Sequence, residues 1–197
     1  LYDVFESVNA RYNSYERNSF FDKINQGAGN WVHVDATTME LIAELQEISA
    51  DLDGYFDMTV MPLIRLWGFY KKENHLIPSA DEIQKILQYV NYKTLTCHDG
   101  NRVGVEKGQE IITGAFMKAF AVDEVVRKMK TVGISDAIIN AGGSTILGIN
   151  NESHPSWSIA VRDSRKEGET LFHLNISNEC YSTSSSENIY LSIGGKK

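Results

Sequence analysis

The sequence predicts an α+β fold with a largely antiparallel sheet and flanking helices. Apolar residues recur at helical spacing mostly in the first half, whereas the second half contains short alternating or apolar segments bounded by turn residues. A Rossmann fold is not expected, because no G-x-G-x-x-G motif is present. The 197 residues suffice for one core and no Pro-, Gly- or Ser-rich linker divides them, so we expect a single domain over 1–197.

The first half is expected to be helical around one short strand. A helix is predicted over residues 1–12, turning near residues 13–14, and a loop over 25–30 leads to a strand at 31–34. A second helix is expected from a cap at Thr37 or Thr38 to Leu52, and Gly54 ends it. A third is expected to begin at Pro62, after a loop that starts at residue 56. A fourth is expected after Pro78, Ser79 and Glu82, which form a capping-box pattern.

The second half is expected to be richer in strands. Residues 94–98 and 103–105 flank Asp-Gly-Asn, a strong hairpin signal. Residues 157–161 alternate as in a sheet with one solvated face, and residues 171–176 and 190–193 add two more strands.

Residues 114–148 combine a helix, a strand and a double glycine. An amphipathic helix is expected over 115–132 with Gly133 as its left-handed cap, followed by a strand over 137–141 that is buried on both faces. Gly142 and Gly143 come next. They either form a bulge or tight turn, which the residues alone favour, or bring backbone N–H groups to a phosphate or sugar.

Charge and cysteine content narrow the function classes. The net charge of −7 and pI near 5.2 argue against a nucleic-acid or anionic membrane surface, both of which need clustered Lys and Arg. Cys97 and Cys180 have no metal-ligand spacing, so we expect free, partly buried thiols, with a single disulfide as the alternative. No apolar stretch is long enough for a membrane span and no signal peptide is recognisable at the start.

Three segments resemble one protein family. Residues 56–70, FDMTVMPLIRLWGFY, are similar to the family pattern F-D-x-T-V-x-P-L-x-x-L-W-G-F, and residues 181–186, YSTSSS, are weakly similar to its Thr-Ser-Gly turn. A further pattern, D-L-G-G-x-x-K-G-x-A-x-D followed by a helix and a strand ending in N-x-G-G-x, is matched by Gly114, Lys118, Ala121, Asp123, Asn140, Gly142 and Gly143. On these residues, nearly the whole chain resembles the ApbE family, the FAD:protein FMN transferases.

The resemblance implies an ApbE-like (T-fold-like) domain and a transferase of flavin. The implied reaction moves FMN from FAD to a threonine hydroxyl of an acceptor flavoprotein, releases AMP and depends on Mg²⁺. The implied FAD-binding residues are Tyr15, Tyr55, Phe56, Asp57 and Lys118, and the main-chain carbonyl of Ala115 is the implied metal ligand. The catalytic residues are not assigned. From the residues alone, Tyr15 could instead be a loop-packing residue, Phe56 a core residue, Asp57 a helix or turn cap and Lys118 a solvated charge; their shared register with the family pattern is what favours the functional roles.

The departures from the family pattern point to a second hypothesis. Ile112 stands where the family has an acid, Ala115 and Ala119 replace glycines, and Ser185 replaces the last glycine of the Thr-Ser-Gly turn. We also expect the domain to lack the family's first strand and its C-terminal metal-binding segment, which is either lost or supplied by another chain. The alternative is therefore a catalytically impaired FAD-binding or scaffold protein of the same fold.

The chain begins with Leu1 and not Met, so an N-terminal segment is expected to have been removed. Many members of the resembled family are exported lipoproteins, which implies an extracytoplasmic (periplasmic or cell-surface) protein, peripherally attached to the membrane through a removed lipid anchor. A third, unrelated hypothesis treats the double-glycine turn as part of a phosphosugar or nucleotide hydrolase. It has little support, because the five histidines are scattered and form no Cys/His or Ser/His spacing.

Overall fold

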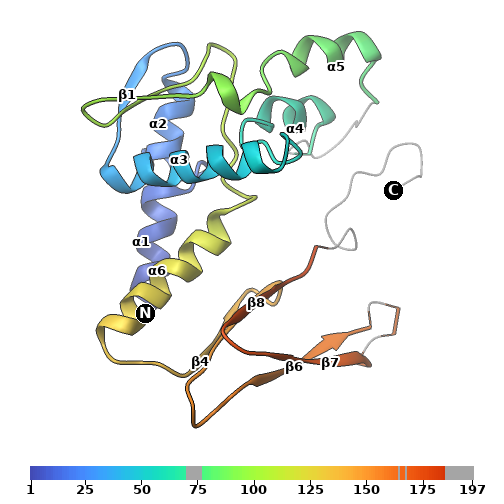
Figure 1. The fold of residues 1–197 in the computed structure, drawn as a ribbon. Helices are drawn as coiled ribbons and strands as arrows, with labels where there is room; N and C mark the ends of the chain where they lie inside the picture. The colour runs from blue at the N-terminus through green and yellow to red at the C-terminus, as the bar shows by residue number, and fades with distance from the viewer. Residues whose placement is uncertain (70–76, 164, 167, 185–197) are drawn as a thin grey trace. The chain divides into compact units, whose positions relative to one another are not determined.

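In the computed structural model, which describes residues 1–69, 77–163, 165–166 and 168–184, the chain divides into two units (Figure 1). One comprises Ser7–Met117 and the other Leu1–Glu6 with residues 118–184. All pairings between named strands are antiparallel, but they form three small sheets and not one. The α+β prediction is therefore confirmed.

The residue 7–117 unit holds most of the helices. They are α1 (Tyr2–Tyr12, from Ser7 on), α2 (Phe20–Gln26), α3 (Ala36–Asp51), α4 (Met61–Trp67), α5 (Ala80–Leu87) and the short 3₁₀ helix η1 (Tyr92–Thr94). A sheet of order β1-β3-β2 completes the unit, with β1 (Trp31–His33), β2 (Thr96–His98) and β3 (Arg102–Gly104). Figure 1 shows α4 and α5 together at one end of this unit and β1 at the other.

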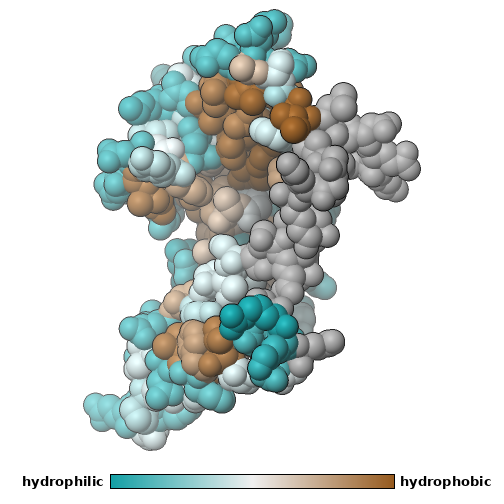
Figure 2. Space-filling view, turned by 90° about the vertical axis from the view of Figure 1, so that its right-hand side faces the viewer, coloured by the Kyte–Doolittle hydropathy of each residue, from teal (hydrophilic) through white to brown (hydrophobic). Residues whose placement is uncertain are grey.

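The core of this unit joins helices and loops that are distant in sequence. Its largest fully buried apolar side chains are Phe21, Ile24, Ile42, Met58, Met61, Val103 and Ile111. Figure 2 shows hydrophobic side chains gathered on the face where α4 and α5 lie; the exposed large apolar residues near these helices are Phe69, Ile77 and Leu87.

Helix starts follow local side-chain chemistry. Ser79 accepts from the N–H of Glu82 and Glu82 accepts from the N–H of Ser79, so the predicted capping box is confirmed. Pro62 lies in the first turn of α4, as expected for a residue whose missing N–H is not needed there. The cap of α3 is Asp35 and not Thr37 or Thr38; the sequence prediction was wrong because an aspartate directly before the helix accepts the free N–H of Thr38 at 2.8 Å.

Asp35 also fixes α1 to the start of α3. Its carboxylate accepts from the Tyr12 hydroxyl at 3.0 Å and pairs with Arg11 at 2.5 Å. Burial acts to raise the pKa of Asp35, but the hydrogen bonds from Thr38 and Tyr12 and the charge of Arg11 outweigh it and hold this pKa below its usual value. Burial and the Asp35 charge raise the pKa of Tyr12.

The residue 118–184 unit is mainly strands after one helix. It contains α6 (Met117–Thr131, from Lys118 on), β4 (Ala137–Ala141), β5 (Thr145–Ile149), β6 (Trp157–Arg162), β7 (Thr170–Ile176) and β8 (Glu179–Ser182). The strands form a sheet of order β4-β5-β8 and a β6-β7 hairpin, and Val125, Met129, Ile159 and Ile176 are buried. Gly133 ends α6 with φ +77°, as predicted.

Three expectations need correction. The strand over 137–141 is not buried on both faces: its residues alternate between half-buried and exposed, so one face of β4, an edge strand of its sheet, is open to solvent. Asn25 lies in α2 and not in a loop, and α2, β5 and β8 were not predicted. Cys97 and Cys180 are free, as expected, but their residues are exposed and not partly buried. The strand expected at 190–193 lies outside the described residues.

Candidate functional site

Residues 110–113, of which 111–113 are buried, organise the candidate site in the residue 7–117 unit. Ile111 and Thr113 are fully buried. The N–H of Ile112 donates to the carbonyl of Met58 at 2.8 Å, and the Thr113 hydroxyl oxygen accepts from the N–H of Ser14 at 3.0 Å. The loops that carry the predicted residues 15 and 55–57 are therefore both fixed to this one segment.

Asn25 holds the same segment from a third side. Its side-chain N–H donates to the carbonyl of Ile111 at 2.9 Å, and its side-chain oxygen accepts from the N–H of Ile111 at 2.7 Å. One amide thereby replaces the partner strand that a buried backbone needs. Sequence analysis missed this residue, because the seven-residue α2 is too short to give a clear periodic signal.

Asp57 braces the loop that precedes α4. One carboxylate oxygen accepts from the N–H of Thr59 at 2.7 Å and from its hydroxyl at 2.6 Å, and the other accepts from the N–H of Tyr92 at 2.9 Å. The buried Thr59 hydroxyl in turn accepts from the N–H of Asn91 at 2.9 Å. The described contacts thus give Asp57 a positioning role, and its predicted contact with FAD stays a prediction.

The aromatic residues predicted to bind FAD lie beside this braced loop. The Tyr15 hydroxyl reaches the Met61 sulfur at 4.0 Å, and its ring is half-exposed. Tyr55 is 96% exposed and Phe56 is half-buried. Exposed aromatic faces suit a planar ligand such as a flavin or adenine ring, because such rings can stack on them. Their contact with FAD stays a prediction.

The residues at the predicted metal site do not by themselves fit Mg²⁺. Ala115 is exposed, which leaves room at its main chain, but Ile112 stands at the position of the family acid and is buried and apolar. Within the described part of the chain, no group of three or more His, Cys, Asp or Glu could hold a metal ion. Mg²⁺ is a hard cation that prefers oxygen ligands, so one carbonyl is not a sufficient set.

In the residue 118–184 unit, the start of α6, the double-glycine turn and residues 182–183 meet at Ser144. The Lys118 ammonium, at the start of α6, donates to the Ser144 hydroxyl at 2.9 Å. The Ser144 carbonyl accepts from the N–H of Thr183 at 2.8 Å and from the hydroxyl of Ser182 at 3.3 Å. The helix start, the double-glycine turn and residues 182–183 are therefore joined, and Ser144 is the residue that sequence analysis overlooked.

The double glycine is needed for its backbone conformation. Gly142 and Gly143 have φ +70° and +75°, and the N–H of Gly143 donates to the side-chain oxygen of Asn140 at 2.7 Å. A Cβ at either glycine would meet nothing within 4 Å, so close packing does not require them. The tight-turn interpretation is confirmed, and phosphate or sugar binding at this turn stays a prediction.

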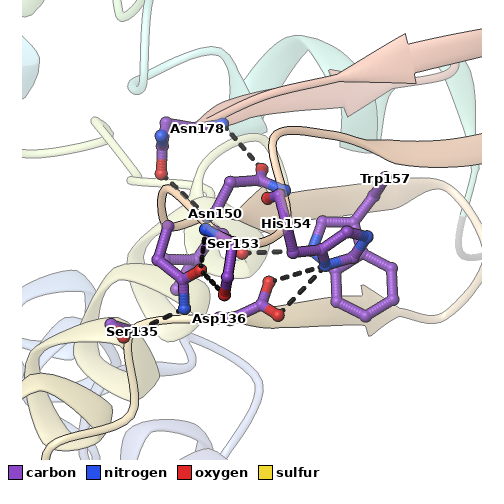
Figure 3. A network of polar contacts seen from close by, with 9 residues as sticks. Ser135, Asp136, Asn150, Ser153, His154, Trp157 and Asn178 are labelled. Carbon is purple, nitrogen blue, oxygen red and sulfur yellow. Dashed lines mark hydrogen bonds and ion pairs between the residues drawn. The ribbon is translucent and has the colours of Figure 1, made fainter.

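A polar network at the other end of the β4-β5-β8 sheet joins three connecting loops (Figure 3). The His154 ring N–H donates to the carboxylate of Asp136 at 2.9 and 3.0 Å, and its ring meets that of Trp157 edge to face. Asn150 and Asn178 exchange two backbone-to-side-chain bonds at 3.0 and 3.1 Å.

This network bears on the hydrolase hypothesis. The nearby Ser153 hydroxyl donates to Asn151 and not to His154, so the His154–Asp136 pair activates no nucleophile among the described residues. The role of the network is to fix the three loops. Of the five histidines considered for a hydrolase, His75 lies outside the described residues.

The sequence matches the family model for the ApbE family over residues 1–197. The chain belongs to the ApbE family. It is 23% identical over 205 residues to the FAD:protein FMN transferase of Haemophilus influenzae, covering 98% of this chain and 59% of that protein. It is 26% identical over 193 residues to the protein of the same name from Escherichia coli K12, covering 93% of this chain and 54% of that one.

Solved ApbE structures share the fold. A crystal structure of the ApbE protein from Thermotoga maritima has a TM-score of 0.87 and 27% identity, covering 98% of this chain and 63% of that one. The flavin transferase ApbE from Vibrio cholerae has a TM-score of 0.71 at 24% identity, covering 81% of this chain and 52% of that one, which supports the fold alone. The chain therefore spans between about half and three fifths of the curated relatives it matches.

For this ApbE-family chain, the structure brings the predicted residues together in two groups. Ser14, next to Tyr15, and Met58, next to Asp57, are hydrogen-bonded to Thr113 and Ile112, and Lys118 lies at Ser144. Asp57 and Lys118 belong to different units, so their predicted convergence on a single dinucleotide stays a prediction.

Proposed function

We propose that this ApbE-family chain is part of an FAD:protein FMN transferase. The observation that carries the proposal is the family match over all 197 residues, together with relatives that bear this name. Two features of the structure support it. Tyr15 and Tyr55 are exposed and Phe56 is half-buried, and the start of α6, the double-glycine turn and residues 182–183 meet at Ser144.

In the proposed reaction, the hydroxyl oxygen of an acceptor threonine forms a bond to the FMN phosphorus of FAD. The pyrophosphate P–O bond breaks, AMP leaves with the bridging oxygen, and the hydroxyl proton passes to a base that is not assigned here. Tyr15, Tyr55 and Phe56 would hold the rings of FAD, and Lys118 would place a positive charge near its phosphates. Asp57 would keep the aromatic loop in position through Thr59 and Tyr92.

The proposed dependence on Mg²⁺ rests on the family and not on the side chains described here. Ala115 would contribute only its main-chain carbonyl to the metal site. A second candidate function is an FAD-binding or scaffold protein without turnover, and the buried Ile112 favours it, because isoleucine offers no ligand atom.

The decisive experiment mixes the purified protein with FAD, Mg²⁺ and a threonine-containing acceptor peptide. AMP release and a peptide that gains the mass of FMN support the transferase, and loss of both on adding a chelator supports the Mg²⁺ requirement. FAD binding without AMP release supports the scaffold function. An FAD titration with no spectral change and no heat would overturn both.

Lys118→Ala tests the site assignment, with Lys128→Ala as the matched control. Both lysines are exposed on α6, but only Lys118 lies beside Ser144. We expect weaker FAD binding in the first variant and unchanged binding in the second. Equal affinities in the two variants would remove Lys118 from the site.

We propose further that the protein acts outside the cytoplasm and is attached to the membrane through a covalently bound lipid. No helix in the described portion of the chain is long and apolar enough to cross a bilayer. Fractionation of cells that make the full-length protein, with metabolic labelling by a fatty acid, tests this. Unlabelled protein in the cytoplasmic fraction would contradict it.

A further inference from the structure

An open hollow of about 490 Å³ lies beside the β1-β3-β2 sheet, within the residue 7–117 unit. It is lined by the α2–β1 loop, by residues of β1, η1, β2 and β3, and by the segment after β3. The lining residues are Gly29, Asn30, Trp31, Thr94, Thr96, Gly104, Val105, Glu106 and Lys107. None of the predicted FAD or metal residues lies in this lining. Its volume falls within the range of small-molecule sites, about 300–1,000 Å³.

Trp31 provides a flat apolar surface at this hollow. It pairs with Gly104 across the sheet, and a Cβ on Gly104 would approach the Trp31 ring to 3.1 Å. The ring therefore lies closely over a strand that has no side chain at this point. The residue is nevertheless 49% exposed and lines the hollow, although its ring also meets that of His98 edge to face.

The rest of the lining is polar and electrically balanced. The N–H of Gly29 donates to the carbonyl of Val105 at 2.8 Å, which ties the segment that carries Asn30 to the one that carries Glu106 and Lys107. These three side chains are exposed, and no hydrogen bond or ion pair joins them to another group in the described ranges. One carboxylate, one ammonium and one amide are thus available, with no net charge.

We propose that this hollow binds a neutral saccharide, with one sugar ring stacked on Trp31. The C–H groups on one face of a sugar ring are weakly positive and pack on the negative face of an aromatic ring. Its hydroxyl groups both donate and accept, as the amide of Asn30, the carboxylate of Glu106 and the ammonium of Lys107 require. A phosphorylated ligand fits less well, because Glu106 cancels the charge of Lys107.

The test is calorimetric titration of the whole chain with three uncharged trisaccharides: triacetylchitotriose, cellotriose and maltotriose. We expect at least one to bind, and Trp31→Ala to weaken it by about fivefold or more. Tyr2→Ala, which removes another exposed aromatic side chain that is not among the residues lining the hollow, should leave the affinity unchanged. Thermal melting of each variant shows that the chain is folded.

A second pair of variants separates stacking from general damage. Trp31→Phe keeps a flat ring and should retain part of the affinity. Gly104→Ala keeps Trp31 but displaces its ring, so it should also weaken binding. Adenosine and FAD are titrated in parallel. The proposal is overturned if no trisaccharide binds, if Trp31→Ala binds as well as the wild type, or if only adenosine or FAD binds in a Trp31-dependent way.

Discussion

Replacing Asp57 with asparagine separates a bracing role from a direct contact with the ligand. The amide oxygen of asparagine can still accept from the N–H and hydroxyl of Thr59, but its NH₂ group would face the N–H of Tyr92, where the carboxylate now accepts at 2.9 Å. One hydrogen bond to a charged group is lost and one backbone donor is left without a partner. The expected loss is about 1.5–3 kcal/mol in the free energy of unfolding.

Asp57 is half-buried, so water compensates in part and the lower end of this range is expected. Asp57→Ala removes all three bonds and should cost about 4 kcal/mol or more, a large fraction of the stability of a typical domain. The asparagine variant is therefore the better test, because it is expected to stay folded.

Urea unfolding followed by circular dichroism measures the effect, and an FAD titration follows on each folded variant. Asp51→Asn is the matched control: this exposed acid at the end of α3 has no hydrogen-bond partner among the described residues, and its change should stay within about 0.5 kcal/mol. An unchanged stability of Asp57→Asn would refute the bracing argument. If FAD binding were lost at unchanged stability, Asp57 would contact the ligand directly.

Three further predictions concern Asn25 at the buried Ile111, the double-glycine turn and the cap of α3. Asn25→Ala leaves both backbone groups of the buried Ile111 unpaired and should cost about 2–4 kcal/mol by urea unfolding, whereas the exposed neighbour Gln26→Ala should cost far less; equal losses would contradict the argument. Gly143→Ala forces alanine to φ +75° and should lower stability by about 1–2 kcal/mol, while Gly143→Asn should lower it less; a neutral alanine would show that the turn relaxes. Because the folded pKa of Asp35 is lowered, its stabilisation is present above the unfolded pKa and is lost as pH falls through the folded value; the stability difference between wild type and Asp35→Asn should therefore shrink below about pH 4, and a constant difference would refute this.

Local signals in the sequence identified most helices and hairpins correctly. The capping box at Ser79, the proline in the first turn of α4 and the glycine after α6 act within a few residues, so their effect can be read from neighbours alone. The Asp-Gly-Asn turn between β2 and β3 was predicted for the same reason. The errors fell where the periodic signal was short, as in α2, or where several capping residues stand close together, as at the start of α3, where Asp35 and not Thr37 or Thr38 is the cap.

The residue types at the motif positions, and hence the family, were determined by the sequence. The partners of these residues were decided by the tertiary structure: Asp57 reaches Tyr92, Asn25 reaches Ile111 and Lys118 reaches Ser144, across 35, 86 and 26 positions of the chain. Hydrogen bonds depend on distance and direction in space, and no periodic pattern encodes which distant segment a side chain will meet. The burial of Ile112 and the exposure of β4 likewise followed only once neighbouring strands and helices had taken their places.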